Sequence, residues 1–370
     1  MDKELSALVR SYDPHIPLER AVTLPAPFYL DGRVLKLEQR TVFFRSWQVV
    51  GRTAQVAVPG CYLTAEVAGE PVLVVRGHDG VLRAFYNVCR HHAAAVMTEP
   101  EGRTDWLRCP YHGWTYALSG ELRGTPDFQG ACDFDRDAHG LLPIAVACWQ
   151  GWVLVRLAPE GPSLQDYLGE ELSQQIAALD LSRLSFFCRR RYEVPCNWKV
   201  FIDNYLDGGY HVPHLHRGLA SVLDNARYAI ELGDRFCLQW SPLSTEHAEA
   251  ETAAVRTGER ALYYWIYPNF MINWYEGAMD TNLVVPRGVD RTEVIFDYYF
   301  ADTSPAAEPR NLASIGVSER IQQEDVAVCQ SVQRGLASRS YLAGRLSPRR
   351  EAGEHLFHRL LHADLISAFI

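Results

Sequence analysis

The sequence predicts an α+β protein in two parts: an all-β domain, then a domain in which long helices accompany aromatic strands. Short β-rich runs between turn residues fill the first half, and long aromatic runs fill the second. Two helical runs, residues 311–336 and 353–366, lie near the end of the chain. With 370 residues, of which 48% are hydrophobic, the chain is long enough for about two domains.

The predicted elements follow in order. Residues 1–38 are punctuated by proline, as in PHIPLER and LPAPFYL, and are predicted to form an arm that packs on the second domain. Residues 39–160 are predicted to form the all-β domain, with strands at YLTAEV, PVLVVRG, LRAFYNV and GWVLVRL. Residues 161–370 are predicted to form the second domain, which opens with a helical stretch. Its predicted strands lie in residues 261–277, 281–288 and 292–302.

Composition excludes several classes of function. The formal net charge is −9 and no run of Lys and Arg stands out, so nucleic acid is not an expected partner. No apolar run approaches the roughly 18 residues of a membrane span, and no apolar signal region is seen, so we expect a cytoplasmic protein. Nine cysteines without paired spacing argue against a disulfide framework and leave metal ligation open.

Two Cys/His pairs in the β-rich half form the first candidate metal site. Cys89 and His91 are one residue apart in VCRHHAA, and Cys109 and His112 are two residues apart in RCPYHGWTY. Two such pairs on facing hairpin tips suit either a structural zinc ion or a [2Fe-2S] cluster with two histidines on one iron. Proline and glycine around the second pair allow backbone N–H groups to turn toward the sulfurs, which favours the cluster. A zinc-stabilised binding protein is the non-enzyme alternative.

The second candidate site lies in DGGYHVPHLH. Helical spacing from Trp198 to Tyr210 predicts a helix, on which Asp203, Asp207 and His211 share one face. A proline at position 213 cannot continue that helix. His214 and His216 therefore lie beyond a break, and from the residues alone either one can join His211.

A carboxylate for this site is expected in the helical run 311–336. An apolar stripe on that run comprises Ile321, Val328, Cys329, Val332 and Leu336. Asp325 sits in the middle of the stripe, whereas Glu324 lies at its edge and can reach solvent. A buried, unpaired carboxylate costs several kcal/mol, and a metal ion removes that cost. Two histidines and one acid make the open facial triad of non-haem Fe(II) oxygenases.

The pattern CRHH with CPYHGWTY resembles the Rieske iron–sulfur motif of ring-hydroxylating oxygenase large subunits. The resemblance implies an all-β Rieske domain with a [2Fe-2S] cluster on Cys89, His91, Cys109 and His112. It implies a second, catalytic domain of α+β helix-grip (START-like) fold with an antiparallel sheet. His92 stands where the family often has Arg, and we interpret it as a surface residue or a neighbour of the cluster rather than a ligand.

The same resemblance assigns the second site. The family motif H-x4-H maps onto His211 and His216, with Asp325 as the carboxylate ligand of a mononuclear Fe(II). Asp207 is the candidate that hydrogen-bonds a ligand histidine, either in the cluster of the next subunit, which it would bridge to the iron site, or in its own site. The spacing from Asp207 to His211 is four where many relatives show three, so Asp203 or Asn204 are alternatives for this role.

Three longer segments, among them NWKVFIDNYLDGGYHVPHLH, look most like the choline monooxygenase group. This resemblance implies a terminal oxygenase that uses O2 and electrons from a separate flavin- and iron–sulfur-containing reductase with NAD(P)H. It implies hydroxylation of a small quaternary ammonium compound such as choline or a betaine, and assembly as a homotrimer. The alternative enzyme is an aromatic-ring hydroxylating dioxygenase that acts on an aromatic acid.

Aromatic residues form the predicted substrate pocket, because aromatic cages bind quaternary ammonium by cation–π attraction. The predicted lining is Tyr205, Tyr263, Trp265 and Trp274. An ordinary aromatic core strand is the competing interpretation of the strand residues. A third histidine group, His355, His358 and His362, shares one face of the last helical run without an accompanying acid or cysteine at a convincing spacing, and predicts only an amphipathic terminal helix.

Overall fold

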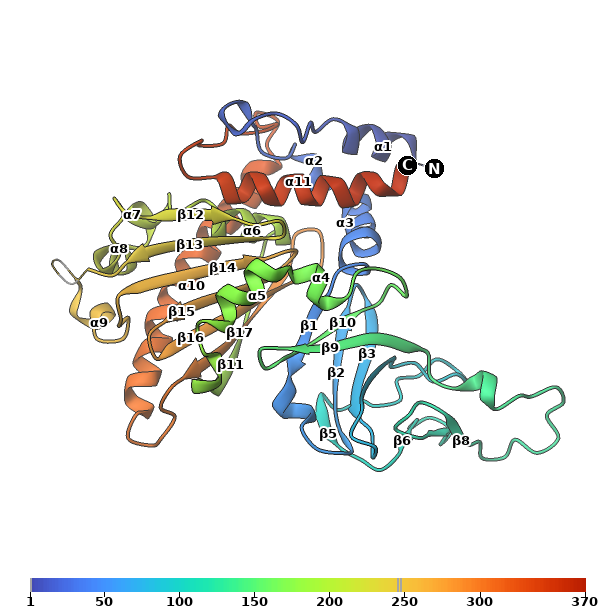
Figure 1. The fold of residues 1–370 in the computed structure, drawn as a ribbon. Coiled ribbons are helices and arrows are strands. Elements are labelled where there is room, and N and C mark those ends of the chain that lie inside the picture. The colour runs from blue at the N-terminus through green and yellow to red at the C-terminus, as the bar shows by residue number, and fades with distance from the viewer. Residues whose placement is uncertain (1, 245, 247) are drawn as a thin grey trace. The chain divides into compact units, whose positions relative to one another are not determined.

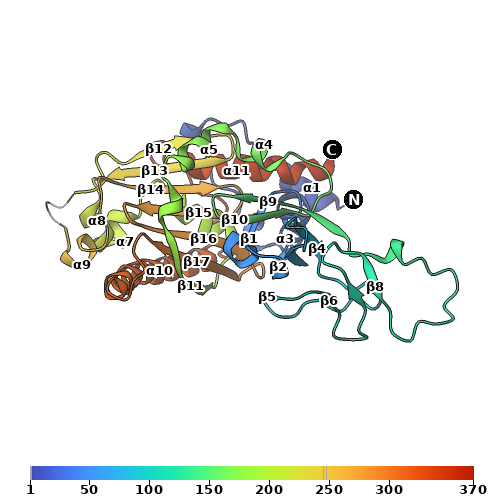
Figure 2. The ribbon, with the colours of Figure 1, turned by 60° about the horizontal axis from the view of Figure 1, so that its bottom comes forward.

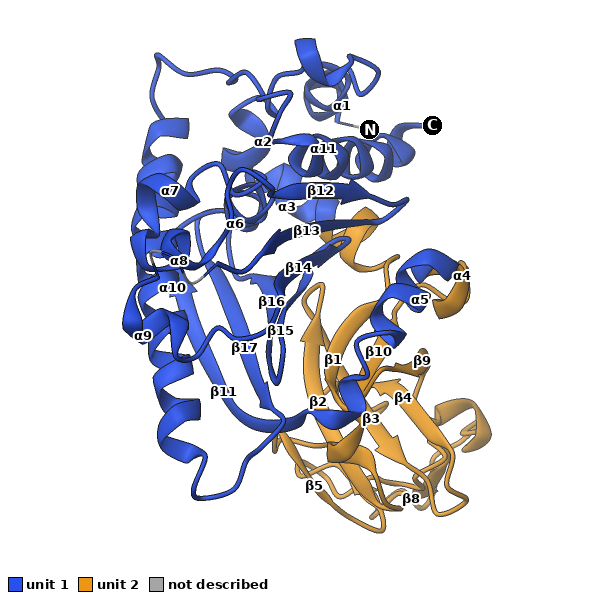
Figure 3. Ribbon diagram, turned by 60° about the vertical axis from the view of Figure 1, so that its left-hand side comes forward, with its two compact units in different colours: residues 1–38, 168–370 blue, residues 39–167 orange. Residues whose placement is uncertain are grey.

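A computed structural model describes residues 2–244, 246 and 248–370. It divides into two units, which Figure 3 shows in different colours. Unit 1 comprises the residues up to Glu38 together with Leu168–Ile370. Unit 2 comprises Gln39–Tyr167. Among the described residues, no helix combines the length and the apolar character that a bilayer crossing requires.

Unit 2 is built from antiparallel strands. Its main sheet has the order β1-β10-β9-β4-β3-β2-β5, and a small sheet has the order β6-β7-β8. The strands are β1 (Gln48–Arg52), β2 (Cys61–Val67), β3 (Glu70–Arg76), β4 (Leu82–Tyr86), β5 (Glu101–Arg103), β6 (Leu107–Arg108), β7 (Thr115–Tyr116), β8 (Leu122–Gly124), β9 (Pro143–Trp149) and β10 (Trp152–Arg156). The four predicted strands coincide with β2, β3, β4 and β10, and the all-β class is confirmed.

Unit 1 contains a seven-stranded antiparallel sheet with the order β11-β17-β16-β15-β14-β13-β12. Every neighbouring pair after β11 and β17 is consecutive in the chain, as in a meander. The strands are β11 (Ser185–Val194), β12 (Ala229–Leu232), β13 (Phe236–Pro242), β14 (Arg260–Ile266), β15 (Phe270–Tyr275), β16 (Ala278–Pro286) and β17 (Thr292–Phe300). The mixture of this sheet with long helices confirms the predicted α+β class.

The helices of unit 1 carry the second candidate site. The longest, α10 (Glu308–Leu336), lies against the sheet and contacts α6 (Trp198–Tyr205), and Figure 2 shows α10 nearly end-on. The last long helix, α11 (Ala352–Ile366), lies beside α1 (Lys3–Arg10) in Figure 1. The remaining helices are α2 (Pro27–Leu30), α3 (Gly32–Glu38), α4 (Leu164–Leu168), which crosses the unit boundary, α5 (Glu170–Ala177), α7 (Val212–Leu215), α8 (Arg217–Val222) and α9 (Ala250–Ala253).

A buried ion pair joins the N-terminal arm to the rest of unit 1. Lys199 Nζ lies 2.6 Å from Glu38 Oε1, and both side chains are fully buried. The Trp198 indole N–H donates to the other carboxylate oxygen of Glu38 at 2.8 Å. The arm is thereby anchored to α6, the helix that leads into the candidate site.

Two predicted helices are shorter than expected. The predicted helix from Trp198 to Tyr210 ends at Tyr205, because Gly208 and Gly209 adopt φ values of +68° and +67°. A Cβ at Gly208 would lie 2.0 Å from the Arg350 carbonyl oxygen, so this tight turn requires glycine. The helical stretch after residue 161 is likewise divided into α4 and α5 at Gly169, where φ is +76°.

Two candidate metal centres and a substrate cavity

The four residues of the first site lie on two loops of unit 2. Cys89 and His91 follow β4, and Cys109 and His112 lie between β6 and β7. Both cysteines are almost fully buried. Burial raises the pKa of the Cys109 thiol, backbone N–H groups of Tyr111 and His112 lower it, and a contact with Cys89 raises it further. The two sulfurs therefore face each other, and N–H groups point at one of them, as the sequence predicted.

His91 of this site presents a free ring nitrogen. The ring centroids of His91 and His112 are 4.7 Å apart, and His91 stacks on Trp114 at the same distance. His91 Nδ1 is buried and has no hydrogen-bond partner. Burial and the neighbouring His92 and His112 lower the pKa of His91, which favours the neutral ring that binds metals.

The spacing of these donors favours a two-iron cluster over a single ion. Among the described residues, no three donor atoms of this Cys/His set lie within 4.8 Å of one another, as a single ion would require. A tetrahedral zinc ion with bonds of about 2.0–2.3 Å needs that closeness, whereas a [2Fe-2S] cluster holds its cysteines and histidines on different irons. His92 is exposed, with its ring centroid 4.1 Å from that of His91.

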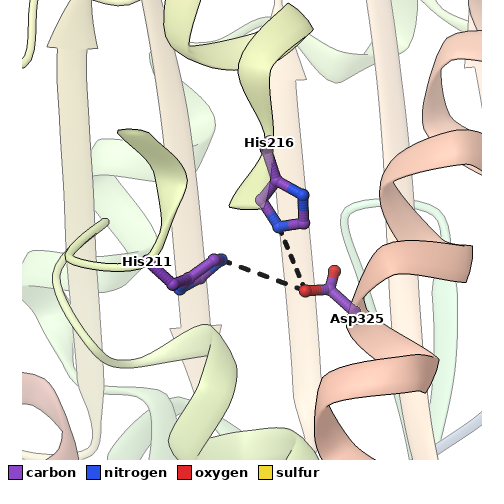
Figure 4. A group of neighbouring side chains, drawn as sticks. All are labelled: His211, His216 and Asp325. Carbon is purple, nitrogen blue, oxygen red and sulfur yellow. Dashed lines mark hydrogen bonds and ion pairs between the residues drawn. The ribbon is translucent and has the colours of Figure 1, made fainter. Parts of the chain in front are cut away.

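The second site is a triad of His211, His216 and Asp325, whose candidate ligand atoms all lie within 4.8 Å of one another (Figure 4). Asp325 Oδ1 is 3.1 Å from His216 Nε2 and 3.9 Å from His211 Nε2. His211 and His216 flank α7, and Asp325 projects from α10. The His216 side chain is 2% exposed and that of Asp325 is 13% exposed, so the triad is shielded from solvent.

Each member of the triad has an outer hydrogen-bond partner. Asp207 Oδ2 lies 2.6 Å from His211 Nδ1, and Glu324 Oε2 lies 2.6 Å from His216 Nδ1. These carboxylates accept the Nδ1 protons, which leaves both Nε2 atoms free as ligands. The Asn204 amide donates to Asp325 at 2.8 Å. Burial lowers the pKa of His216, but the bonds and charges of Asp325 and Glu324 outweigh it and the pKa is raised.

Glu324 was missed as a site residue. The sequence placed it at the edge of the apolar stripe, and the structure turns it to His216. Within the stripe itself, Val332 is 45% exposed, which departs from the expectation. His214 is exposed and lies apart from the triad, between Val212 and Leu215 on α7. The only signal for Glu324 in the sequence was its position next to Asp325.

Asp203 does not share a helix face with His211. It accepts a hydrogen bond from Tyr29 at 2.6 Å and lies 3.0 Å from His358 Nε2. His358 also lies 3.8 Å from Glu354, and the three acidic and imidazole groups form a second close cluster. The expectation that no acid accompanies the terminal histidines at a convincing spacing is therefore wrong, because Glu354 lies one helical turn before His358 and Asp203 joins them from a segment remote in sequence. The face carrying His355, His358 and His362 is buried.

A cavity of about 110 Å³ in unit 1 reaches the triad. Besides the triad its aromatic lining consists of Phe201, Tyr205, Tyr228, Tyr263, Tyr275 and Phe296. Buried polar side chains, among them Arg256, Asp280 and Gln322, complete it. Tyr205 and Tyr263 were predicted, whereas the other rings of the lining and the polar residues were not in the predicted pocket.

Trp265 and Trp274 are corrections to the predicted pocket. Neither belongs to the cavity lining. Trp265 is fully buried against Phe357 of α11, at a ring-centroid distance of 5.6 Å, and donates its N–H to the Pro268 carbonyl. Asn273 and Tyr275 line the cavity, so Trp274 between them points to the other face of β15.

Comparison with protein families decides the identity. Residues 46–144 match the Rieske [2Fe-2S] domain, and residues 181–365 match the catalytic domain of the ring-hydroxylating alpha subunit. The chain belongs to the ring-hydroxylating oxygenase family. The oxygenase is therefore an enzyme with a Rieske [2Fe-2S] domain, and the predicted cluster type is confirmed.

Relatives of this oxygenase cover almost its whole length. Choline monooxygenase of Arabidopsis thaliana chloroplasts is 40% identical over 98% of the chain and 87% of its own. The carnitine monooxygenase oxygenase subunit of Escherichia coli K12 is 30% identical over 93% of the chain and 94% of its own. These similarities place the oxygenase with the predicted choline monooxygenase group and its relatives.

Solved structures agree with the fold. The crystal structure of a quaternary ammonium Rieske monooxygenase with L-carnitine is 28% identical, covers 94% of this chain and 96% of its own, and has a TM-score of 0.82. Naphthalene 1,2-dioxygenase from Rhodococcus, at 20% identity and a TM-score of 0.81, shares the fold over 99% of both chains. The predicted pairing of a Rieske domain with an oxygenase catalytic domain is confirmed.

Proposed function

We propose that this oxygenase hydroxylates a quaternary ammonium compound at a methyl or methylene carbon beside the nitrogen. The observation that carries the proposal is that an aromatic cavity ends at the His211–His216–Asp325 triad. Rings attract such cations by about 0.5–2 kcal/mol per contact. Choline and carnitine, which the relatives' names specify, are compounds of this class.

We propose that the triad holds mononuclear Fe(II). Two imidazoles and one carboxylate are its facial ligand set, and when bound it supplies O2 activation at open coordination positions. Asp207 and Glu324 orient the two imidazoles, and Asn204 holds the Asp325 carboxylate through its amide. These outer contacts keep the three donor atoms directed at one point.

The aromatic residues hold the substrate and exclude water. Burial raises the pKa of Tyr205, Tyr228 and Tyr263 well above the usual range, so all three remain neutral phenols. Tyr205 donates its hydroxyl proton to Asn273 at 2.8 Å, which fixes the ring at the cavity wall. A cation beside such rings is dehydrated and positioned without a full counter-charge.

The proposal also includes the electron donor and the oligomeric state. A separate flavin- and iron–sulfur-containing reductase using NAD(P)H supplies electrons to the Rieske cluster, and the chain assembles as a homotrimer. The structure of one relative, a quaternary ammonium Rieske monooxygenase, is described as giving insight into electron transfer between subunits. Asp207 is the proposed bridge to a neighbouring cluster. Location in the cytoplasm stays a prediction.

A turnover assay tests the proposed substrate class. Purified oxygenase with a generic reductase should couple NADH oxidation to O2 consumption and product formation on choline, carnitine or a betaine. Hydroxylation of an aromatic acid, with only uncoupled peroxide from the quaternary ammonium compounds, would make the dioxygenase alternative correct.

A further inference from the structure

The cavity contains a buried cation that the proposed hydroxylation of a quaternary nitrogen does not use. Arg256 is 7% exposed and lines the cavity. Its two terminal nitrogens bond to Ser314 of α10, one to the hydroxyl at 2.7 Å and one to the carbonyl at 3.4 Å. Its Nε has no partner. The guanidinium therefore has one buried N–H donor without an acceptor.

The charge of Arg256 acts on the Asp280 carboxylate, which also lines the cavity, but only over a distance longer than that of an ion pair. Within the described part of the chain, Arg256 forms no ion pair, and its side chain lies 4.8 Å from the Tyr275 ring centre. Asp280 accepts from the amides of Asn273 and Asn282 instead. Burial raises the pKa of Asp280, and the amide bonds and the Arg256 charge lower it without cancelling the effect of burial, so Asp280 compensates Arg256 only in part. A buried guanidinium without a counter-ion is costly unless a ligand supplies one.

A second donor in the cavity is also unsatisfied. Gln322 is 2% exposed, lines the cavity and has no partner for Nε2. Buried donors are normally satisfied, and here two of them face one cavity. These two donors therefore lack acceptors within the described part of the chain, and an anionic group on the substrate would supply them.

The residue of α10 that bonds Arg256 lies far along the helix from Asp325 of the triad. Ser314 and Asp325 are eleven residues apart on α10, a rise of about 16 Å along the axis, and about three full turns place them on one face. Ser318 and Ile321 lie between them on the same stripe and line the cavity. At the triad end, Tyr205 directly follows Asn204, the partner of Asp325.

We propose that the substrate is a zwitterion, a quaternary ammonium compound with a carboxylate, and that Arg256 binds the carboxylate. The ammonium group then lies among the rings at the triad end, with its methyl groups toward the proposed iron. The proposal rests on the proposed function and adds to it a preference for betaines over choline. Arg256 acts as the specificity-determining residue, because a guanidinium forms paired hydrogen bonds with a carboxylate.

The test compares matched compounds on the unaltered enzyme. Glycine betaine and γ-butyrobetaine are each compared with their amides, which keep the trimethylammonium group and lose the negative charge. Choline is added as a further compound without a carboxylate. We expect kcat/KM for at least one carboxylate to exceed that for its amide and for choline by 10-fold or more. Calorimetry on the same set should show the same order of Kd.

Variants test whether Arg256 is responsible for the preference for carboxylates. Arg256→Gln should reduce kcat/KM for the carboxylate at least 10-fold more than kcat/KM for the amide, so that the preference disappears. Arg256→Lys should retain part of it. Arg260→Gln, at an exposed arginine, is the control and should behave as wild type. The cluster spectrum and Tm report whether each variant is folded.

Two outcomes separate the proposals. If choline and the amides are turned over as well as the carboxylates, the zwitterion proposal is overturned while the quaternary ammonium function stands. If only an aromatic acid is hydroxylated, both are overturned. Should Arg256→Gln fail to fold, the wild-type comparison of carboxylate with amide still decides.

Discussion

Two histidines of one ten-residue segment have opposite surroundings. His216 is buried beside Asp325 and Glu324, whereas His214 is exposed. His216→Ala should abolish mononuclear iron and turnover while the cluster spectrum remains. His214→Ala should retain iron and most activity. Iron analysis with visible spectroscopy measures both, and the reverse pattern would remove His216 from the proposed ligand set.

Glu324 is expected to act through His216. Its carboxylate, 2.6 Å from His216 Nδ1, fixes the ring orientation. Loss of such an outer partner typically costs 10–100-fold in metal affinity. Glu324→Ala should weaken iron binding within that range, and Glu324→Gln should recover part of it. Glu319→Ala, on the same helix and bonded to Arg190 instead, is the control. Equal iron affinity in the Glu324 and Glu319 variants would contradict the assignment.

At the level of single residues, the sequence predicted what local motifs determine. The Cys/His pairs, His211, His216 and Asp325 all lie in short patterns with recognisable spacing. Glu324 and Arg256 gain their partners from segments remote in sequence, whereas Asp280 bonds asparagines of its own strand and of the adjacent one. Arg256, for example, bonds a serine 58 residues away. No period in the sequence encodes such a contact.

Helix α6 depends on the arm through one buried ion pair. Glu38→Gln should destabilise unit 1 by about 3–5 kcal/mol, because it leaves the Lys199 charge buried and unpaired. A drop in Tm on the order of 10 °C is expected. The double variant Glu38→Gln with Lys199→Met should lose less than Glu38→Gln alone. Thermal unfolding measures all three proteins, and a smaller loss in the single variant would refute the coupling.

Helix α11 carries a buried acid whose effect on stability depends on pH. Burial and the charges of Asp203, Glu351 and Asp207 raise the pKa of Glu354 well above its usual range. The stability that this group contributes is full below its unfolded pKa of about 4.5 and is lost as pH rises through the folded pKa.

The neutral variant Glu354→Gln should therefore match wild type near pH 5 and exceed it at pH 8. A rise in Tm of at least about 2 °C at pH 8 is expected. Tm measured across this pH range checks the sign, with the exposed Glu259→Gln as control. Parallel profiles for wild type and Glu354→Gln would show that Glu354 ionises normally.

Element boundaries were predicted less well than element types. The two long helices near the C-terminus, α10 and α11, and the aromatic strands lie where their sequence patterns predicted them. The helix from Trp198 was predicted too long, since its end depends on two left-handed glycines packed beside Arg350. The fold of the domains was accessible from sequence because the Rieske motif is long and specific.

For the whole molecule, the proposed trimer predicts complementation between dead subunits. Cys89→Ala should lack the cluster and Asp325→Ala the mononuclear iron, and each should be inactive alone. Heterologous contacts close into rings, in which one subunit's cluster can serve its neighbour's iron. Co-expressed variants should therefore regain partial activity.

Native mass spectrometry verifies that the rings are mixed. Suppose that mixed rings contain the cluster in one subunit and the mononuclear iron in its neighbour and are still inactive. That result would mean that electrons pass within one chain, and the bridging role of Asp207 would be withdrawn.

The buried pair of Glu38 and Lys199 also has a consequence for biosynthesis. Its partners are 161 residues apart, and the whole of unit 2 emerges from the ribosome between them. At about 5–20 residues per second, the arm waits on the order of 10 s for its partner. During that time Leu24 and Phe28, fully buried in the finished protein, have no core to enter. Unit 2 is continuous and can fold first, so the segment that is made earliest is enclosed last.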